Sequence, residues 1–97
     1  MVKKIRWSKR AQREKHEILQ FWKTKNQSDT YSIHLNQLFL DSVELLAKSP
    51  EIGLISSEYD VRIKIVRDYL IYYRIKNNFI DILAIWDSRR NPKKFKL

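Results

Sequence analysis

The chain has 97 residues, of which 43% are hydrophobic, and a formal net charge of +9 at pH 7. This length suits one domain with a single core, and one glycine with two prolines leaves little room for linkers. The lack of cysteine excludes disulfides and thiolate metal sites. No apolar run approaches the ~18 residues of a membrane span, and none resembles a signal peptide, so we expect a soluble, cytoplasmic protein without a membrane partner.

A short strand and a helix are predicted at the start of the chain. Residues 2–7 alternate weakly between apolar and polar side chains, and Ser8 follows as a favourable helix N-cap. A helix is therefore expected from about Lys9 to Lys25. Ala11, Ile18 and Trp22 form its apolar stripe.

A second helix is predicted from about Asp29 to Lys48. Its expected apolar face consists of Leu35, Leu38, Phe39, Ser42, Leu45 and Leu46. Ser49-Pro50 should end it, because the residue before a proline disfavours helical backbone. The short connection between the two helices predicts an antiparallel helical hairpin.

After Gly53 the hydrophobic period changes from 3.6 to 2, which is typical of strands. Residues 61–66 alternate, and residues 69–76 and 79–86 are rich in β-branched and aromatic side chains. Asn77-Asn78 predicts a two-residue hairpin, because Asn tolerates the positive φ of a type I′ turn. The order β-α-α-β-β-β predicts an α+β two-layer sandwich, with a mainly antiparallel sheet packed on the helical hairpin.

Positive charge gathers at both ends of the chain. Residues 1–25 carry a net charge of +7 and residues 61–97 another +7, whereas residues 26–60 carry −5. Basic surfaces attract phosphate backbones through counterion release. They also suit an acidic protein partner, and many are only solvated surface, so all three interpretations stay open.

Most catalytic classes lack their residues. His16 and His34 lie on predicted helices without a paired ligand, and Gly53, as the single glycine, cannot form a Gly-rich phosphate loop. We therefore expect no metal and no cofactor. Phosphodiester cleavage remains possible, because positioned Lys and Arg side chains can stabilise the charge that develops on the phosphate.

Arg62, Lys64, Arg89 and Arg90 are the candidate cations for such chemistry, with Arg67 as a lesser one. Alternation is expected to place Arg62 and Lys64 on the open face of the sheet, away from the helices. Arg89 and Arg90 follow the last strand and would join them if that strand neighbours residues 61–66. The alternative is an ordinary amphipathic strand with solvated cations. Trp86 is either a packing residue or a base-stacking platform.

Several segments together resemble the RelE/ParE superfamily of type II toxin–antitoxin toxins, which includes plasmid-stabilisation proteins. They are "IRWSKRAQ" (5–12), "LLAKSPEIG" (45–53), "VRIKIVRDYLIYYRI" (61–75) and "IDILAIWDSRRNP" (80–92). The resemblance implies one toxin domain over residues 1–97. It also implies growth arrest and a cognate antitoxin, whose acidic segment is expected to wrap the toxin.

The superfamily splits by target, and the resemblance supports both branches. RelE-like members cleave mRNA on the ribosome, and that pattern makes Arg62, Lys64 and Arg89 catalytic. Arg67, Arg90, Trp86 and Phe95 would then bind substrate. ParE-like members poison DNA gyrase without nuclease activity.

The leading interpretation is a metal-independent endoribonuclease, an mRNA interferase, that binds RNA. Gyrase inhibition, or a decayed toxin that only binds its antitoxin, is the alternative. Two departures from the RelE-like pattern are Leu70, where an arginine is usual, and Phe95, where a tyrosine is usual.

Overall fold

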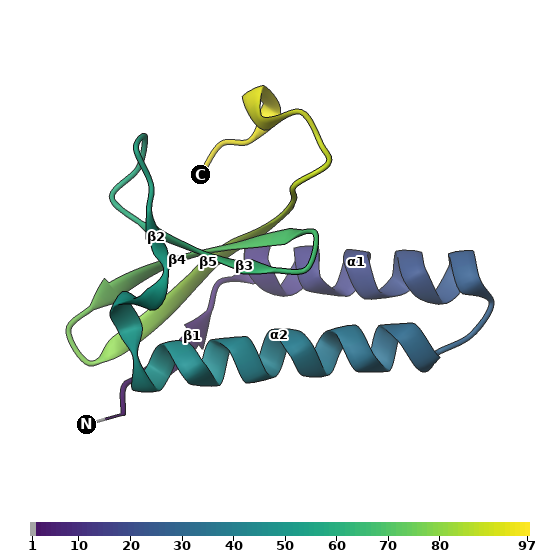
Figure 1. The fold of residues 1–97 in the computed structure, drawn as a ribbon, viewed down its shortest axis with the longest axis horizontal. Helices are drawn as coiled ribbons and strands as arrows, with labels where there is room; N and C mark the ends of the chain where they lie inside the picture. The colour runs from purple at the N-terminus through teal and green to yellow at the C-terminus, as the bar shows by residue number, and fades with distance from the viewer. Residues whose placement is uncertain (1) are drawn as a thin grey trace.

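Five strands form one mixed sheet, and two helices cover one of its faces, in a computed structural model that describes residues 2–97 (Figure 1). In chain order the elements are β1 (Lys4–Trp7), α1 (Lys9–Asn26), α2 (Thr30–Lys48), the 3₁₀ turn η1 (Pro50–Ile52), β2 (Leu54–Ile55), β3 (Arg62–Val66), β4 (Tyr69–Lys76), β5 (Phe79–Asp87) and the 3₁₀ turn η2 (Pro92–Lys94). The predicted α+β class and element order are confirmed. β2 is an additional strand, too short for alternation to predict it.

The strand order in the sheet is β1-β5-β4-β3-β2. β1 runs parallel to β5, whereas the other three neighbouring pairs are antiparallel. β4 and β5 are the longest strands and occupy the centre of the sheet. Because β4 lies between β3 and β5, residues 61–66 do not neighbour the last long strand.

The helix boundaries follow the local signals in the sequence. The Ser8 side chain accepts a hydrogen bond from the Ala11 backbone N–H at 2.9 Å, as an N-cap should. α1 ends at Asn26, and its C-cap residue Gln27 has a left-handed φ of 51°. α2 ends at Lys48, just before Ser49-Pro50. Neither helix within residues 2–97 is both long and apolar enough to cross a membrane.

The main core lies between the sheet and the helical hairpin. Its fully buried side chains come mainly from α2, β4 and β5: Leu35, Phe39, Leu46, Ile71, Tyr73, Ile80 and Ile82. The predicted apolar face of α2 is confirmed at three of these positions, but Leu45 is 45% exposed and Val43 is buried in its place. The face of α2 is therefore rotated slightly from the one predicted.

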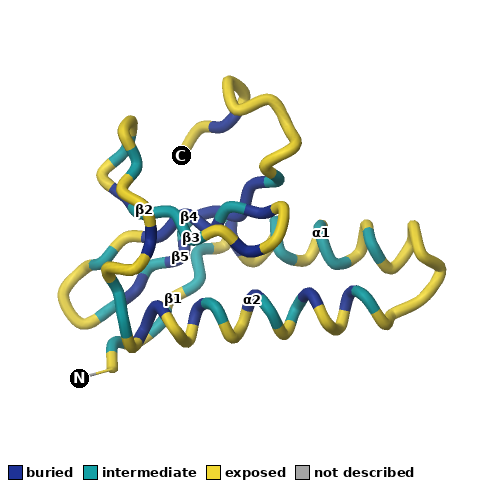
Figure 2. The backbone as a smooth tube through the Cα atoms, in the orientation of Figure 1, coloured by how far each residue is buried: buried dark blue, intermediate teal, exposed yellow. Residues whose placement is uncertain are grey.

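The opposite face of the sheet carries a second, smaller core. It consists of Val61, Tyr72, Ala84, Trp86 and Phe95, with Tyr59, Ile63, Leu70 and Leu83 packed around it. The chain after β5 crosses this face, and Figure 2 shows one buried stretch within that otherwise exposed terminal segment. The sheet is thus covered by helices on one side and by the C-terminal segment on the other.

The register of β3 decides where its cations lie. Arg62 is opposite Tyr73 and Lys64 is opposite Ile71, and both of these partners belong to the helix-facing core. Because directly opposed residues share a face, Arg62 and Lys64 lie on the helix-facing side of the sheet. The prediction that they occupy the open face is wrong. The apolar residue Ile63 instead faces the second core, opposite Tyr72.

Two-residue turns join the central strands. Lys76 pairs with Phe79, which confirms the hairpin at Asn77-Asn78. Of these two residues only Asn77 has a positive φ, 54°, so the turn is not the predicted type I′, which needs two. The turn between β3 and β4 also has one left-handed residue, Arg67, with φ of 57°.

Tyr73 fixes the segment that connects α2 to the sheet. Its buried hydroxyl donates to the Pro50 carbonyl at 2.7 Å and accepts from the Gly53 N–H at 2.9 Å. A Cβ at position 53 would lie 2.4 Å from the Tyr73 hydroxyl oxygen, so only glycine fits there. The single glycine of the chain is therefore explained by close packing.

Replacing Tyr73 with Phe should lower the free energy of unfolding by about 1–3 kcal/mol, because the buried Gly53 N–H and the half-buried Pro50 carbonyl lose their partner. Urea unfolding followed by circular dichroism measures this. Tyr31→Phe is the matched control, since no hydrogen bond of its hydroxyl is found within residues 2–97. Equal losses in the two variants would contradict the proposed role of Tyr73.

Burial raises the pKa values of Tyr69, Tyr72 and Tyr73 above the ordinary value of 10.0. The neutral tyrosines are thus favoured in the folded state. Their contribution to stability is fully present below pH 10 and is lost as pH rises through the folded pKa values. Urea unfolding at about pH 9 and about pH 11 should show this loss, and Tyr73→Phe should reduce it. A loss of the same size in wild type and variant would count against this origin.

Candidate functional site

Arg62, at the start of β3, holds protein backbone. Its Nη1 donates to the carbonyls of Glu51 and Gly53, each at 3.1 Å. Tyr73 also bonds Gly53, as well as the neighbouring Pro50, so arginine and tyrosine together hold the link between α2 and β3. The guanidinium has N–H groups left over, but its position is set by this structural contact.

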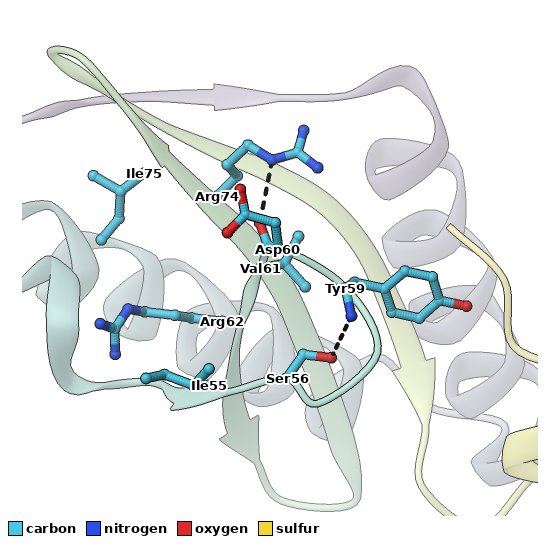
Figure 3. Close-up of a pocket in the computed structure, with 8 residues that line it drawn as sticks. All are labelled: Ile55, Ser56, Tyr59, Asp60, Val61, Arg62, Arg74 and Ile75. Carbon is cyan, nitrogen blue, oxygen red and sulfur yellow. Dashed lines mark hydrogen bonds between the residues drawn. The ribbon is translucent and has the colours of Figure 1, made fainter.

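A hollow of about 350 Å³ lies beside Arg62 at the end of the sheet (Figure 3). Its lining residues are Ile55, Ser56, Tyr59, Asp60, Val61, Arg62, Arg74 and Ile75. The guanidinium groups of Arg62 and Arg74 point in different directions, and Arg74 Nε lies 3.4 Å from the Asp60 carbonyl (Figure 3). The hollow is therefore not lined by cations that converge on one point.

Lys64 and Arg67 lie further along the same hairpin. Lys64 is half-buried in the middle of β3, on the helix-facing side. Arg67 is exposed in the turn after β3, and its Nη2 lies 3.3 Å from Nε2 of His34 on α2. Since an arginine only donates, this contact requires His34 Nε2 to be the acceptor.

Arg89 is paired with Asp87 at the end of β5. Its Nε and Nη2 donate to the two carboxylate oxygens at 3.0 and 2.8 Å, and its backbone N–H donates to Oδ1 at 2.9 Å. The Arg89 hydrogen bond holds the pKa of Asp87 below its ordinary value, and the same bond raises the pKa of Arg89. A bound phosphate would have to compete with this bidentate pair.

Arg90, Trp86 and Phe95 are in contact at the second core. The Arg90 guanidinium lies 4.4 Å from the centroid of the Trp86 ring. Trp86 and Phe95 are each only 7% exposed, and their ring centroids are 5.2 Å apart. Both aromatic rings are therefore packing residues in this conformation, and neither offers a free face to a base.

The candidate cations are spread along the sheet, with Lys64, opposite Ile71, between Arg62 and the turn that holds Arg67. Arg67, Arg89 and Arg90 share one end of the sheet, where the Ser88 N–H donates to the Asp68 carbonyl at 2.7 Å. Arg62 lies opposite Tyr73, whereas Asp87 lies opposite Tyr69. Four residues of strand separate these two positions along β4, about 13 Å. Arg62 and Arg89 therefore do not converge.

Arg10 is a contact residue that sequence reasoning missed. Its Nη1 donates to the Lys96 carbonyl, its Nε lies 3.3 Å from Glu14, and its guanidinium lies 5.2 Å from the Phe95 ring centroid. Arg10 joins α1 to the other end of the chain. No local pattern signals this, because the partners are more than 80 residues apart in sequence.

Glu14 has a second role at the edge of β5. Beyond the end of β1, no strand among residues 2–97 pairs with this edge, and α1 and its N-cap residue supply contacts instead. Glu14 accepts from the Ile85 N–H at 3.0 Å, and the Ser8 hydroxyl donates to the Leu83 carbonyl at 3.0 Å.

Within residues 2–97, no three His, Cys, Asp or Glu side chains are grouped so as to hold a metal ion.

Comparisons with known proteins identify the family and the fold of the chain. A family model described as the ParE toxin of type II toxin-antitoxin system, parDE, matches residues 5–92. A solved structure titled "Chromosomal ParDE TA system from P. aeruginosa" superposes with a TM-score of 0.79 at 17% identity, over 91% of this chain and 98% of that chain. No curated protein matches. The structural match confirms the predicted fold, and the family match spans nearly the whole chain. The chain therefore belongs to the family of ParE toxins of type II toxin–antitoxin systems.

Proposed function

We propose that this toxin arrests growth by binding DNA gyrase. The observation that carries the proposal is the separation of Arg62 from the Asp87–Arg89 pair by about 13 Å along the sheet, with each guanidinium already held by protein oxygen atoms. Membership of the ParE family points the same way, because the ParE-like branch of the superfamily acts on gyrase without nuclease chemistry.

The physical argument concerns preorganisation. A nuclease stabilises the charge on a single phosphate with donors that already point at it, and it gains little from cations spread over the sheet. Here Arg62 would have to leave the Glu51 and Gly53 carbonyls, and Arg89 would have to leave Asp87. Binding a large protein needs no such convergence, because its contacts are spread over a wide surface.

Cleavage of mRNA, the leading interpretation of the sequence alone, stays a prediction. In that reading Arg62, Lys64 and Arg89 act on the phosphate, and Arg67, Arg90, Trp86 and Phe95 bind the RNA. Trp86 and Phe95 would first have to become exposed, since both are buried.

An antitoxin is the partner that membership of a type II system implies. We propose that its contact segment is acidic. The exposed side chains of Arg90, Lys93, Lys94 and Lys96 lie within seven residues of one another near the C-terminus. A segment that folds as it binds can cover such an extended basic surface.

Induced expression without antitoxin should produce chromosomal DNA breaks and a DNA damage response while protein synthesis continues at first. The reason is that a poisoned gyrase leaves cut DNA but does not touch the ribosome. Pulse labelling of protein and DNA synthesis, with a supercoiling assay on purified gyrase, measures both. A prompt stop in translation with cuts inside codons would favour the nuclease. Harmless expression would indicate a decayed toxin.

Replacing Lys64 with Ala separates the two mechanisms by magnitude. A nuclease that loses a general acid or base should lose about 10²–10⁴ in rate. A gyrase-binding toxin that loses one half-buried surface charge should retain activity within about tenfold, a change of 1.4 kcal/mol in binding. The amount of toxin needed to arrest growth on induced expression measures either loss, and Lys76→Ala, an exposed lysine on β4, is the control. A loss above a hundredfold with normal folding would overturn the binding mechanism.

A further inference from the structure

Residues 91–97, the C-terminal strap, cross the second face of the sheet with few attachments to it. Their side chains are exposed except that of Phe95, which is 7% exposed. The strap's own turn satisfies its polar groups: Lys94 N–H and Phe95 N–H bind the carbonyls of Asn91 and Pro92, and Lys93 N–H binds the Asn91 side chain. Attachment to the body therefore depends on the Phe95 ring and on Arg10.

The Phe95 ring fills a site made of three aromatic side chains, Tyr59, Tyr72 and Trp86, called the aromatic slot. It stacks on Tyr72 with centroids 4.1 Å apart and an interplanar angle of 18°. Trp86 and Tyr59 meet it edge-on at 5.2 and 6.2 Å. Three separate segments of the fold thus build a slot for one planar apolar ring, and the ring that occupies it comes from the chain's own terminus.

The closed strap leaves one polar group unsatisfied. Trp86 Nε1 is buried and has no hydrogen-bond acceptor within residues 2–97. A buried donor without a partner is unfavourable, and water or a ligand oxygen would relieve it once the strap moves. Since ordering the strap also costs conformational entropy, the closed state is opposed by two terms. Among residues 2–97, the strap is held closed only by the Phe95 side chain and by the hydrogen bond from Arg10.

Charge around the slot indicates what else fits it. Arg10 lies 5.2 Å from the Phe95 ring centroid, and Arg90 lies 4.4 Å from the Trp86 ring centroid. The strap adds Lys93, Lys94 and Lys96, all exposed. An occupant from another protein is favoured if it carries a large apolar ring flanked by carboxylates, because the ring matches the slot and the carboxylates match the cations.

We propose that the aromatic slot is a docking site for gyrase, and that an aromatic side chain from an acidic gyrase segment displaces Phe95 as the strap moves aside. This proposal rests on the proposed function, since it names the surface that meets the target. A strap that is closed most of the time lowers the apparent affinity in proportion to its open fraction. Phe95 is thus an internal competitor for the target's side chain.

Opening of the strap is tested without gyrase, by hydrogen exchange at the tryptophan indole N–H groups in NMR spectra. Phe95→Ala should speed the exchange of Trp86 at least ~tenfold, because its N–H then reaches water. The indole of Trp22, which donates to the Tyr69 hydroxyl at 2.7 Å, is the control within the same spectrum and should not change. An unchanged Trp86 rate would overturn the strap as a cover. Phe95→Tyr should retain the wild-type rate.

Docking is tested by the affinity of purified toxin for gyrase. Phe95→Ala should bind at least about threefold more tightly, because the competitor is gone. Tyr72→Leu added to it should remove this gain, since the stacking platform is lost while apolar volume is kept. Phe21→Ala, on the exposed side of α1, is the matched aromatic control and should bind like wild type.

A covalently closed strap gives the opposite change. The chain has no cysteine, so Arg10→Cys with Lys96→Cys can be joined selectively by a short bis-maleimide. The joined protein should bind gyrase at least about tenfold more weakly than the same protein capped with N-ethylmaleimide, which lacks the same two cations but has a strap that can open. Weaker or unchanged binding by Phe95→Ala, or full binding by the closed form, would overturn the docking site.

The two proposals fail in different ways. Wild-type toxin that shows no binding to gyrase would overturn the proposed function, while Trp86 exchange still reports strap opening. If the affinity for gyrase does not change when Phe95 is replaced, only the assignment of the aromatic slot as the docking site is overturned. Phe95→Ala could instead bind the antitoxin more tightly while its gyrase binding stays unchanged. This result would show that the slot binds the antitoxin, and it would overturn the assignment to gyrase.

Discussion

The structure depends on two central strands, β4 and β5, that carry apolar side chains on both faces. Tyr73 and Ile82 pack against the helices, while Tyr72 and Trp86 face the opposite way. A sheet with two apolar faces needs two covers, and this chain has one helical hairpin. The C-terminal segment has to act as the second cover. This requirement explains why a terminus that is otherwise polar and exposed contains one buried phenylalanine.

Local signals predicted most of the fold. Ser8 sets the start of α1, Pro50 sets the end of α2, and the change of period after Gly53 indicates the three longer strands, because each acts through its immediate neighbours. The facing of β3 was not predictable in the same way. Its alternation shows two different faces, but assigning the apolar one to the helices assumes that the other is solvated. Here Ile63 packs against the second core, on the face assumed to be solvated. The assumption therefore assigned Arg62 and Lys64 to the wrong face of the sheet.

The candidate site was less predictable than the fold, since it depends on pairing between distant segments. The sequence shows that Arg62 and Arg89 are cations, but not that backbone carbonyls hold the first and Asp87 holds the second. Strand order decides whether they meet, and β4 lies between their strands. The role of Arg10 could not be predicted for the same reason, because it depends on a contact with Lys96 near the other end of the chain.

The parallel pairing of β1 with β5 constrains when the molecule can be completed during its synthesis. Lys4 pairs with Phe79, so the first strand must wait for the last one to be made. At 5–20 residues per second, the intervening stretch takes the ribosome about 4–15 s. Until then β1 has no partner, β5 is missing from the main core, and the strap does not exist. A growing chain of this protein therefore lacks the complete toxin fold until synthesis is nearly over. An antitoxin already present can bind the toxin as soon as that fold is completed.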